Sequence, residues 1–138
     1  MADTLKLEIV TPETTIYSED VEMVTLPGSE GEAGIYPNHV PLMTRVQAGE
    51  IIVNRSGTEE VVAIGEGFAE ITGDHIAILT DNAANSADID EAAAEEAKAK
   101  AEQRLEEGGD ISEEEAKALT HAILYSRAQI TAKRRKRG

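Results

Sequence analysis

The side chains that could carry out acid–base or metal chemistry are numerous in this chain, but none is spaced as in a known catalytic or metal site. The three histidines, His39, His75 and His121, are isolated in the sequence, and cysteine is absent, so neither a His-rich nor a thiolate metal site is expected. His75 is expected in solvent at a hairpin end. The carboxylate runs at residues 59–60 and 113–115 lack the ligand spacing of a calcium loop. No nucleophile elbow, phosphate-binding glycine loop or dinucleotide fingerprint occurs. The sequence therefore predicts a non-catalytic chain with no metal and no cofactor.

Residues 28–44 form the most distinctive stretch, and we call them the signature segment. They read GSEGEAGIYPNHVPLMT, with three glycines and two prolines. Glycine allows backbone angles that a side chain would forbid, and proline fixes its own φ and restricts the residue before it. The composition predicts a stiff loop system with short extended pieces, which holds polar side chains in fixed places.

The signature segment resembles the characteristic loop of the epsilon subunit of bacterial rotary ATP synthases. The resemblance extends along nearly the whole chain, because a β-rich first half is followed by two helices. It implies an N-terminal β-sandwich of about ten strands and a C-terminal antiparallel two-helix hairpin. It also implies a non-catalytic central-stalk (rotor) subunit of a proton-translocating ATP synthase. Such a subunit binds the gamma subunit and the c-ring and couples ring rotation to the catalytic head, and its helices can inhibit ATP hydrolysis through the alpha and beta subunits.

The resemblance assigns contacts within the signature segment by position. Glu30, Glu32 and Tyr36 would face the c-ring. His39, Leu42 and Thr44 would line the contact with gamma. A stiff loop loses little entropy on binding, and the carboxylates suit basic loop residues of a ring. The alternative is that each of these residues only shapes the loop.

Charge is distributed unevenly along the chain. The net charge is −14, and residues 1–87 carry 15 acidic and 3 basic groups, whereas residues 88–138 carry 12 and 10. Five basic residues are consecutive at 133–137. An acidic body repels nucleic acid and anionic lipid, so neither is an expected partner. Without a signal peptide or an apolar run of membrane-spanning length, we expect a cytoplasmic protein that reaches the inner membrane only through the complex.

The first half of the chain has the pattern of short β-strands. Apolar residues alternate at 5–9, and further strands are predicted at 21–26, 49–54, 60–64, 67–72 and 75–80. Gly73-Asp74 is a favoured two-residue hairpin turn. The core must come from Val, Ile, Leu and Met, because the chain has one Phe and no Trp. Residues 81–87 are small, polar and aperiodic, which predicts a boundary between a domain at 1–87 and a second at 88–138.

The second half has helical periodicity. Asp88 with Glu91, and Ser112 with Glu115, have the spacing of capping boxes, and Gly108-Gly109 separates the two helices. The expected apolar stripe of the first helix is Ile89, Ala93, Ala97, Ala101 and Leu105. That of the second is Ala116, Leu119, Ile123 and Ile130, with Ala122 and Ala128 beside it.

The first of these stripes is mostly alanine, which limits how firmly the hairpin can be held. Burying one methyl group stabilises by roughly 0.8 kcal/mol, against about 1.5–3 kcal/mol for a leucine or isoleucine side chain. We therefore hypothesise that the hairpin is marginally held and can leave the β domain. The alternative is a permanently docked hairpin that only stabilises.

The resemblance also bears on nucleotide binding. Some relatives bind ATP through Ile or Leu, Asp, two residues, Arg and Ala at the first helix start. Here Ile89 and Asp90 match, but Ala93 stands at the arginine position, and two arginine positions of the second helix fall on His121 and Tyr125. The phosphate-neutralising cations are missing, so we expect weak or no ATP binding.

The basic end suits an inhibitory arm. By the resemblance, an acidic loop of the catalytic beta subunit would receive Arg127, Lys133, Arg134, Arg135, Lys136 and Arg137, with salt-sensitive strength. The alternative is a solvated, disordered tail. A rival for the whole chain is a free-standing β-sandwich adaptor whose basic tail touches nucleic acid. That function favours aromatic residues among the basic ones, and the tail has none.

Overall fold

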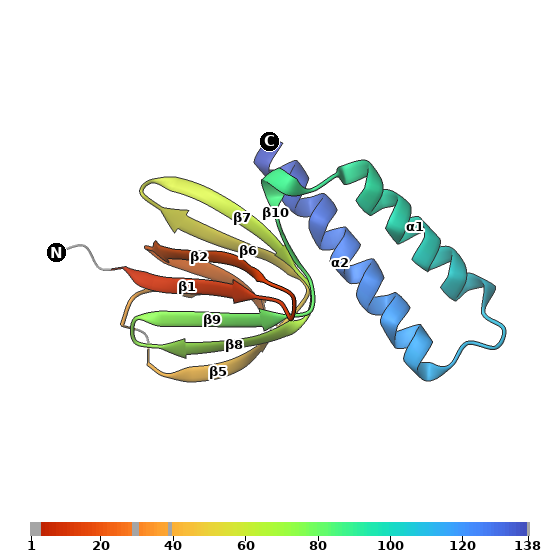
Figure 1. Ribbon diagram of the computed structural model, residues 1–138, viewed down its shortest axis with the longest axis horizontal. Coiled ribbons are helices and arrows are strands. Elements are labelled where there is room, and N and C mark those ends of the chain that lie inside the picture. The colour runs from red at the N-terminus through yellow and green to blue at the C-terminus, as the bar shows by residue number, and fades with distance from the viewer. Residues whose placement is uncertain (1–3, 29–30, 39, 138) are drawn as a thin grey trace.

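The computed structural model describes residues 4–28, 31–38 and 40–137, and of Lys136 and Arg137 only the backbone. Two five-stranded sheets pack face to face, and two helices follow them (Figure 1). The strands are β1 (Leu5–Val10), β2 (Thr15–Val21), β3 (Met23–Gly28), β4 (Gly31–Ile35), β5 (Leu42–Val46), β6 (Gly49–Arg55), β7 (Thr58–Ile64), β8 (Gly67–Thr72), β9 (His75–Thr80) and β10 (Ala83–Asn85). A 3₁₀ turn η1 (Ser86–Asp88) leads into α1 (Glu91–Glu107) and α2 (Glu113–Arg137). The predicted fold class is confirmed.

The two sheets of the sandwich differ in what covers their outer faces. One sheet, which we call the first sheet, has the order β2-β1-β9-β8-β5, and the second has the order β10-β7-β6-β3-β4. All pairs of neighbouring strands in the described sheets are antiparallel, except that β1 and β9 are parallel. Helix α2 lies against β6 and β7 of the second sheet, and α1 packs on α2 away from the sandwich (Figure 1). Within the described residues, no helix therefore covers the outer face of the first sheet.

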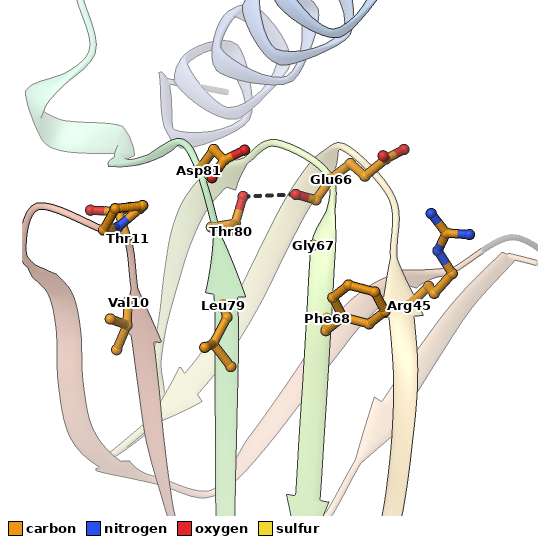
Figure 2. A pocket seen from close by; sticks show the side chains of 10 residues that line it. Val10, Thr11, Arg45, Glu66, Gly67, Phe68, Leu79, Thr80 and Asp81 are labelled. Atoms are coloured by element: carbon orange, nitrogen blue, oxygen red, sulfur yellow. Dashed lines mark hydrogen bonds between the residues drawn. The ribbon is translucent and has the colours of Figure 1, made fainter.

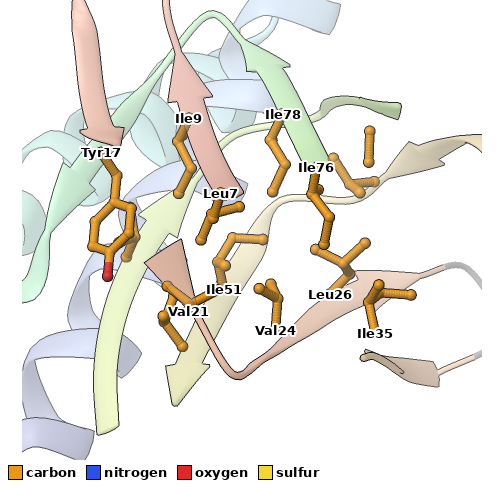
Figure 3. Packing of buried hydrophobic residues seen from close by; sticks show 14 of the residues in the cluster. Leu7, Ile9, Tyr17, Val21, Val24, Leu26, Ile35, Ile51, Ile76 and Ile78 are labelled. Atoms are coloured by element: carbon orange, nitrogen blue, oxygen red, sulfur yellow. The ribbon is translucent and has the colours of Figure 1, made fainter. Parts of the chain in front are cut away.

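The core lies between the sheets and follows from the alternation of the strands. Leu5, Leu7 and Ile9 of β1 are buried in this core. Figure 3 shows Leu7 and Ile9 pointing inward, together with Ile76 and Ile78 of β9. As predicted, aliphatic side chains dominate this core. Tyr17 is the one aromatic residue of the cluster, since Phe68 is exposed.

Local turn chemistry predicted the hairpins well. Strands β8 and β9 have the predicted bounds, with Thr72 paired to His75 across Gly73-Asp74. Strands β6 and β7 turn at Ser56 and Gly57, whose φ angles are 52° and 77°. Positive φ at both positions belongs to the hairpin turn whose twist matches that of the strands.

The prediction of one strand at 21–26 was wrong. The chain bends at Glu22, so that Val21 ends β2 and Met23 begins β3. Strand β2 was not predicted, because its exposed residues 18–20 hide the alternation. Strand β3 also continues through Pro27 and Gly28 instead of ending there. Only Met23–Thr25 of β3 pair with β6. Pro27 lies beyond this paired part, so the N–H that proline lacks is not needed for a hydrogen bond to β6.

The polar stretch 81–87, which was predicted as a domain boundary, contains regular secondary structure. Residues Ala83–Asn85 form β10, which pairs with Val62–Ile64 of β7, and Ser86 begins η1. The pairing with a distant strand supplies the order that the local sequence does not predict.

The start of the first helix differs from the prediction. Asp90 caps α1, its carboxylate accepting the N–H of Ala93 at 3.1 Å, whereas Asp88 ends η1. The predicted cap on the second helix is confirmed, because the Ser112 hydroxyl accepts the N–H of Glu115 at 3.0 Å. Asp88 and Asp90 are both suitable N-cap residues. The 3₁₀ turn η1 includes Asp88, so the helix begins after Asp90 and Asp90 becomes its cap.

The buried faces of the helices were predicted in part. In α1, Ala94 and Ala101 are buried, whereas the predicted Ala93 and Ala97 are exposed. In α2, Ala128 and Ile130 are buried as predicted, and Ala122 is exposed. Ser126 and Ala132, which are also buried, were not predicted. In the part of the chain that the structure describes, neither helix combines the length and hydropathy needed to cross a membrane.

Candidate functional site

An exposed row of side chains crosses the outer face of the first sheet. The strand registers place Val10 beside Leu79, Leu79 beside Phe68, and Phe68 beside Arg45 (Figure 2). Phe68 is 51% and Leu79 54% exposed. The row lines a shallow hollow of about 470 Å³. Large apolar side chains that gather on one face of a soluble domain mark an interaction site.

The alternation of the strands explains why this row faces outward. Ala69 and Ile71 of β8, and Ile76 and Ile78 of β9, point into the core. Their neighbours must therefore point outward, because successive side chains of a strand alternate. The sequence predicted the strands but not this row, although the same alternation would have found Phe68 and Leu79.

Two further contacts define the row. The guanidinium carbon of Arg45 lies 5.8 Å from the centroid of the Phe68 ring, a geometry that favours a cation–π interaction. Next to Phe68, a Cβ on Gly67 would collide with the carbonyl oxygen of Leu79. Glycine therefore allows the close approach of β8 to β9 at the end of the row. The row thus combines apolar area with one positive charge on a rigid support.

The signature segment continues this exposed surface. It contains β4 and the start of β5, which are edge strands of the two sheets. Met43 lies on the same face of β5 as Arg45, and Val40, Leu42 and Met43 are all exposed. The row therefore extends along β5 to Met43, whereas Leu42 pairs with the core-facing Ile71 and lies on the opposite face of the strand. We call Val10, Phe68, Leu79, Arg45 and Met43 the apolar surface.

The predicted contact residues of the signature segment lie in different places. Glu32 is exposed on β4, and Tyr36, which is 62% exposed, follows that strand. Leu42 is exposed and Thr44 is half-buried, and both lie on the face of β5 opposite to Met43 and Arg45. Glu30 and His39 lie outside the described residues. The structure thus leaves Glu32, Tyr36 and Leu42 open to solvent, and neither Leu42 nor Thr44 belongs to the apolar surface.

The histidine at the hairpin end has a partner. His75 Nε2 lies 2.6 Å from Glu8 Oε1, and both side chains are partly exposed. The expectation that His75 is merely solvated was therefore wrong. Parallel pairing of β1 with β9 brings these residues together, and this pairing is not visible in the sequence.

A polar network joins the edges of the two sheets. The Tyr17 hydroxyl donates to Glu60 Oε1 at 2.7 Å, and Arg55 pairs with Glu60 at 3.2 Å and with Glu19 at 3.0 Å. Burial and the hydrogen bond to Glu60 raise the pKa of Tyr17 well above its usual value. Burial also raises the pKa of Tyr125 on α2. The network stabilises the sandwich edge and presents no free nucleophile.

The seam between α2 and the second sheet is small. Its buried residues are Val61 and Ala63 of β7, Ile89, and Ala128 and Ala132 of α2, with Ala84 and Tyr125 packed beside them. Small side chains allow α2 to approach the strands closely, but they bury little apolar area. The structure shows the hairpin in its docked position.

The basic end is bound within the chain. Lys133 Nζ donates to the carbonyl of Ser86 at 3.2 Å, Arg134 pairs with Glu91 and Glu95 at 3.0 and 2.9 Å, and Arg135 pairs with Glu50 at 2.9 Å. Helix α2 runs to Arg137, so the alternative of a disordered tail is wrong for this end. Arg127 is exposed, and the side chains of Lys136 and Arg137 lie outside the described atoms.

The residues of the degenerate nucleotide motif have structural roles. Ile89 is buried in the seam, and Asp90 caps α1. Ala93 is exposed on α1 and carries no charge. Within the described residues, no group of three or more His, Asp or Glu side chains is placed to hold a metal ion.

Known proteins match the chain along most of its length. Residues 4–86 match the family model "ATP synthase, Delta/Epsilon chain, beta-sandwich domain". The ATP synthase epsilon chain of Dehalococcoides mccartyi is 41% identical over 136 residues, which cover 96% of this chain and 95% of the relative. That of Desulforamulus reducens is 40% identical over 125 residues, covering 90% and 95%.

Solved structures have the same fold at lower identity. A chain of the Euglena gracilis mitochondrial ATP synthase, in an assembly of OSCP, F1 and c-ring, superposes with a TM-score of 0.74 at 20% identity and covers 94% of this chain and 81% of its own. A chain from the central stalk and c-ring of the Tetrahymena thermophila enzyme gives 0.57 at 11%, covering 94% and 96%. With the sandwich, the helical hairpin and the signature segment in place, and with these matches along most of its length, the chain belongs to the family of ATP synthase epsilon chains.

Proposed function

We propose that this chain is a non-catalytic central-stalk subunit of a proton-translocating ATP synthase. In this function the sandwich binds the gamma subunit and the c-ring, and it passes the rotation of the ring to the catalytic head. The single observation that carries the proposal is the apolar surface, which is exposed on a sheet face that no helix covers. The chain would reach the cytoplasmic side of the membrane only through the complex.

The gamma subunit is the partner that suits the apolar surface. Phe68 and Leu79 supply two large exposed apolar side chains, and Arg45 supplies a positive charge beside the Phe68 ring. Aromatic and arginine side chains are enriched among the residues that dominate binding energy. Strands hold these side chains in fixed positions, so little entropy is lost on binding. Leu42 and Thr44, and His39 from the resemblance, would extend this contact.

We place the proposed c-ring contact on β4 and on the residues directly after it. Glu32 is exposed there, and Tyr36 offers an aromatic ring with a hydroxyl group. Carboxylates at this place suit basic residues on the polar loops of a ring, and Glu30 would add a second one. Because the charges are exposed, this contact should weaken as salt is added.

The helical hairpin is proposed as an inhibitory arm of ATP hydrolysis. Its cations are Arg127, Lys133, Arg134, Arg135, Lys136 and Arg137, and an acidic surface on the catalytic subunits would receive them. We propose weak or no ATP binding by the hairpin, because Ala93 supplies no cation for a phosphate group. Calorimetry that found micromolar ATP affinity for the isolated chain would overturn this part.

Binding to a purified gamma subunit tests the main proposal. Phe68→Ala and Leu79→Ala are each expected to weaken the complex about 30-fold, since loss of a dominant interface side chain costs about 2 kcal/mol or more. Leu124→Ala is the matched control, because Leu124 is an exposed leucine on α2. Equal affinities for all three variants and the native chain would remove the apolar surface from the gamma contact.

A further inference from the structure

Three consecutive cations at the end of α2 reach three different elements. Arg135 bonds to Glu50 of β6 at 2.9 Å. Lys133 donates to the backbone carbonyls of Ser86 and Ala87 in η1 at 3.2 and 3.5 Å. Arg134 bonds to α1. Successive residues of a helix point about 100° apart, so three in a row spread their side chains around the helix.

Two of the three carboxylates that receive these cations are poorly exposed, whereas the third, Glu95, is 51% exposed. The side chain of Glu50 is 13% exposed, and that of Glu91 is 20% exposed. A charge that is largely removed from water needs a partner, because an unpaired buried charge is unfavourable. Glu50 belongs to the sandwich, and its cation Arg135 belongs to the hairpin. This pair therefore links the two parts of the chain directly.

The contacts lie next to the alanines that α2 contributes to the apolar seam. Ala128 and Ala132 are the α2 members of the seam, and each offers a single methyl group. Lys133 follows Ala132 directly in the sequence, and Arg135 lies three residues after it. The charged contacts therefore extend the seam at the C-terminal end of α2, and they are well placed to decide whether this end stays docked.

We infer that Lys133, Arg134 and Arg135 form an internal clamp, with Glu50 as its main acceptor on the sandwich. The clamp holds the hairpin docked, and while it is closed its cations are not available to an external acidic surface. Docking and inhibition then compete for the same side chains. The second half of this inference rests on the proposed inhibitory arm, whereas the clamp itself does not.

The position of the hairpin can be measured in the full-length chain. The chain has no cysteine, so cysteines placed at the exposed Glu13 of the sandwich and Glu106 of α1 accept a fluorescent donor–acceptor pair. Glu50→Gln is expected to raise the population with separated labels about tenfold, as is Arg135→Gln. Combining the two should add little, because both break one pair. Binding of gamma reports whether each variant keeps a folded sandwich.

Matched controls separate the clamp from a general change of charge. Glu22→Gln removes an exposed carboxylate from the sandwich. Arg127→Gln removes an exposed cation from α2 that forms none of the ion pairs among the described residues. Neither is expected to separate the labels. Equal effects of Glu50→Gln and Glu22→Gln would overturn the clamp, and so would docked labels in both Glu50→Gln and Arg135→Gln.

ATP hydrolysis by the reconstituted complex tests the competition. Glu50→Gln is expected to strengthen inhibition severalfold, because it frees cations that remain present. Arg135→Gln should open the hairpin equally but weaken inhibition, because it also removes a docking cation. If both variants open the hairpin and hydrolysis does not change, the clamp stands and the inhibitory function fails. If both strengthen inhibition equally, the shared use of Arg135 is wrong.

Discussion

The sandwich core and the hairpin seam are two apolar interfaces of the same chain, built from different side chains. Of the residues that the structure describes, 17 are buried in the core cluster, nearly all of them Ile, Val or Leu, whereas five are buried in the seam, and three of these are alanines. A buried leucine or isoleucine contributes about 1.5–3 kcal/mol and an alanine methyl about 0.8 kcal/mol. The sandwich is therefore held by apolar burial. The hairpin contacts the sandwich through a small seam together with charged contacts, and we expect it to open while the sandwich stays folded.

The largest effect is expected from the core. Ile9→Ala removes a fully buried side chain and should lower the free energy of unfolding by about 2–5 kcal/mol. Urea denaturation of the sandwich checks this value. Leu79→Ala is the control. Because Leu79 faces solvent, this substitution should lower the free energy of unfolding far less. Similar losses for both variants would contradict the assignment of the core.

A smaller and more local effect is expected from the seam. Ala132→Leu places extra volume at a fully buried position and should disfavour docking by about 1–3 kcal/mol. The hairpin should then be cut faster by a glutamate-specific protease, with the sandwich left intact. Ala122→Leu, at an exposed position of the same helix, should leave the cleavage rate unchanged. Equal cleavage of the two variants would mean that the seam does not control docking.

The smallest effect is expected at the sandwich edge, where it depends on pH. Tyr17→Phe removes the hydroxyl that donates to Glu60 and should cost about 1 kcal/mol near neutral pH. The pKa of Tyr17 is raised on folding from its usual 10.0, so above pH 10 the unfolded chain loses its proton first. The contribution of Tyr17 to stability is therefore complete below pH 10 and decreases as the pH rises above it.

Denaturation of the native chain and of Tyr17→Phe between pH 7 and about pH 11 checks the sign, because groups that titrate in both proteins cancel in the difference. The two stabilities should converge above pH 10. A difference that grows with pH in this range would show that the pKa of Tyr17 is not raised.

Local signals predicted the part of the fold that local chemistry decides. The turn at Gly73-Asp74 and the cap at Ser112 depend on residues within a few positions, and both are as predicted. The break at Glu22 was missed because apolar residues continue on both sides of it. Strand β10 was missed because its order comes from pairing with β7.

The functional surfaces were predicted less completely, because they depend on contacts between residues that are distant in the sequence. The signature segment indicated Leu42, which is exposed on the other face of β5. It did not indicate Phe68, because the alternation of the strands was used only to find core residues. The partners of the basic end were not predicted either. Arg135 and Glu50 are 85 residues apart in the sequence, and no local pattern connects them. Nearly all residues of α1 are alanine or charged, and alanines occur on both its buried and its exposed face. The apolar periodicity therefore could not predict which alanines are buried.

Hydrogen exchange of the intact native chain, followed by mass spectrometry, tests most directly whether the two regions differ in stability. Amides of α1 and α2 should exchange through an opening that leaves β1, β6 and β9 protected, with an opening free energy several kcal/mol below that of global unfolding. Addition of salt should speed exchange in the helices and leave the strands unchanged. Protection of both helices equal to that of the core strands would contradict the account, because the hairpin would then open only when the sandwich unfolds.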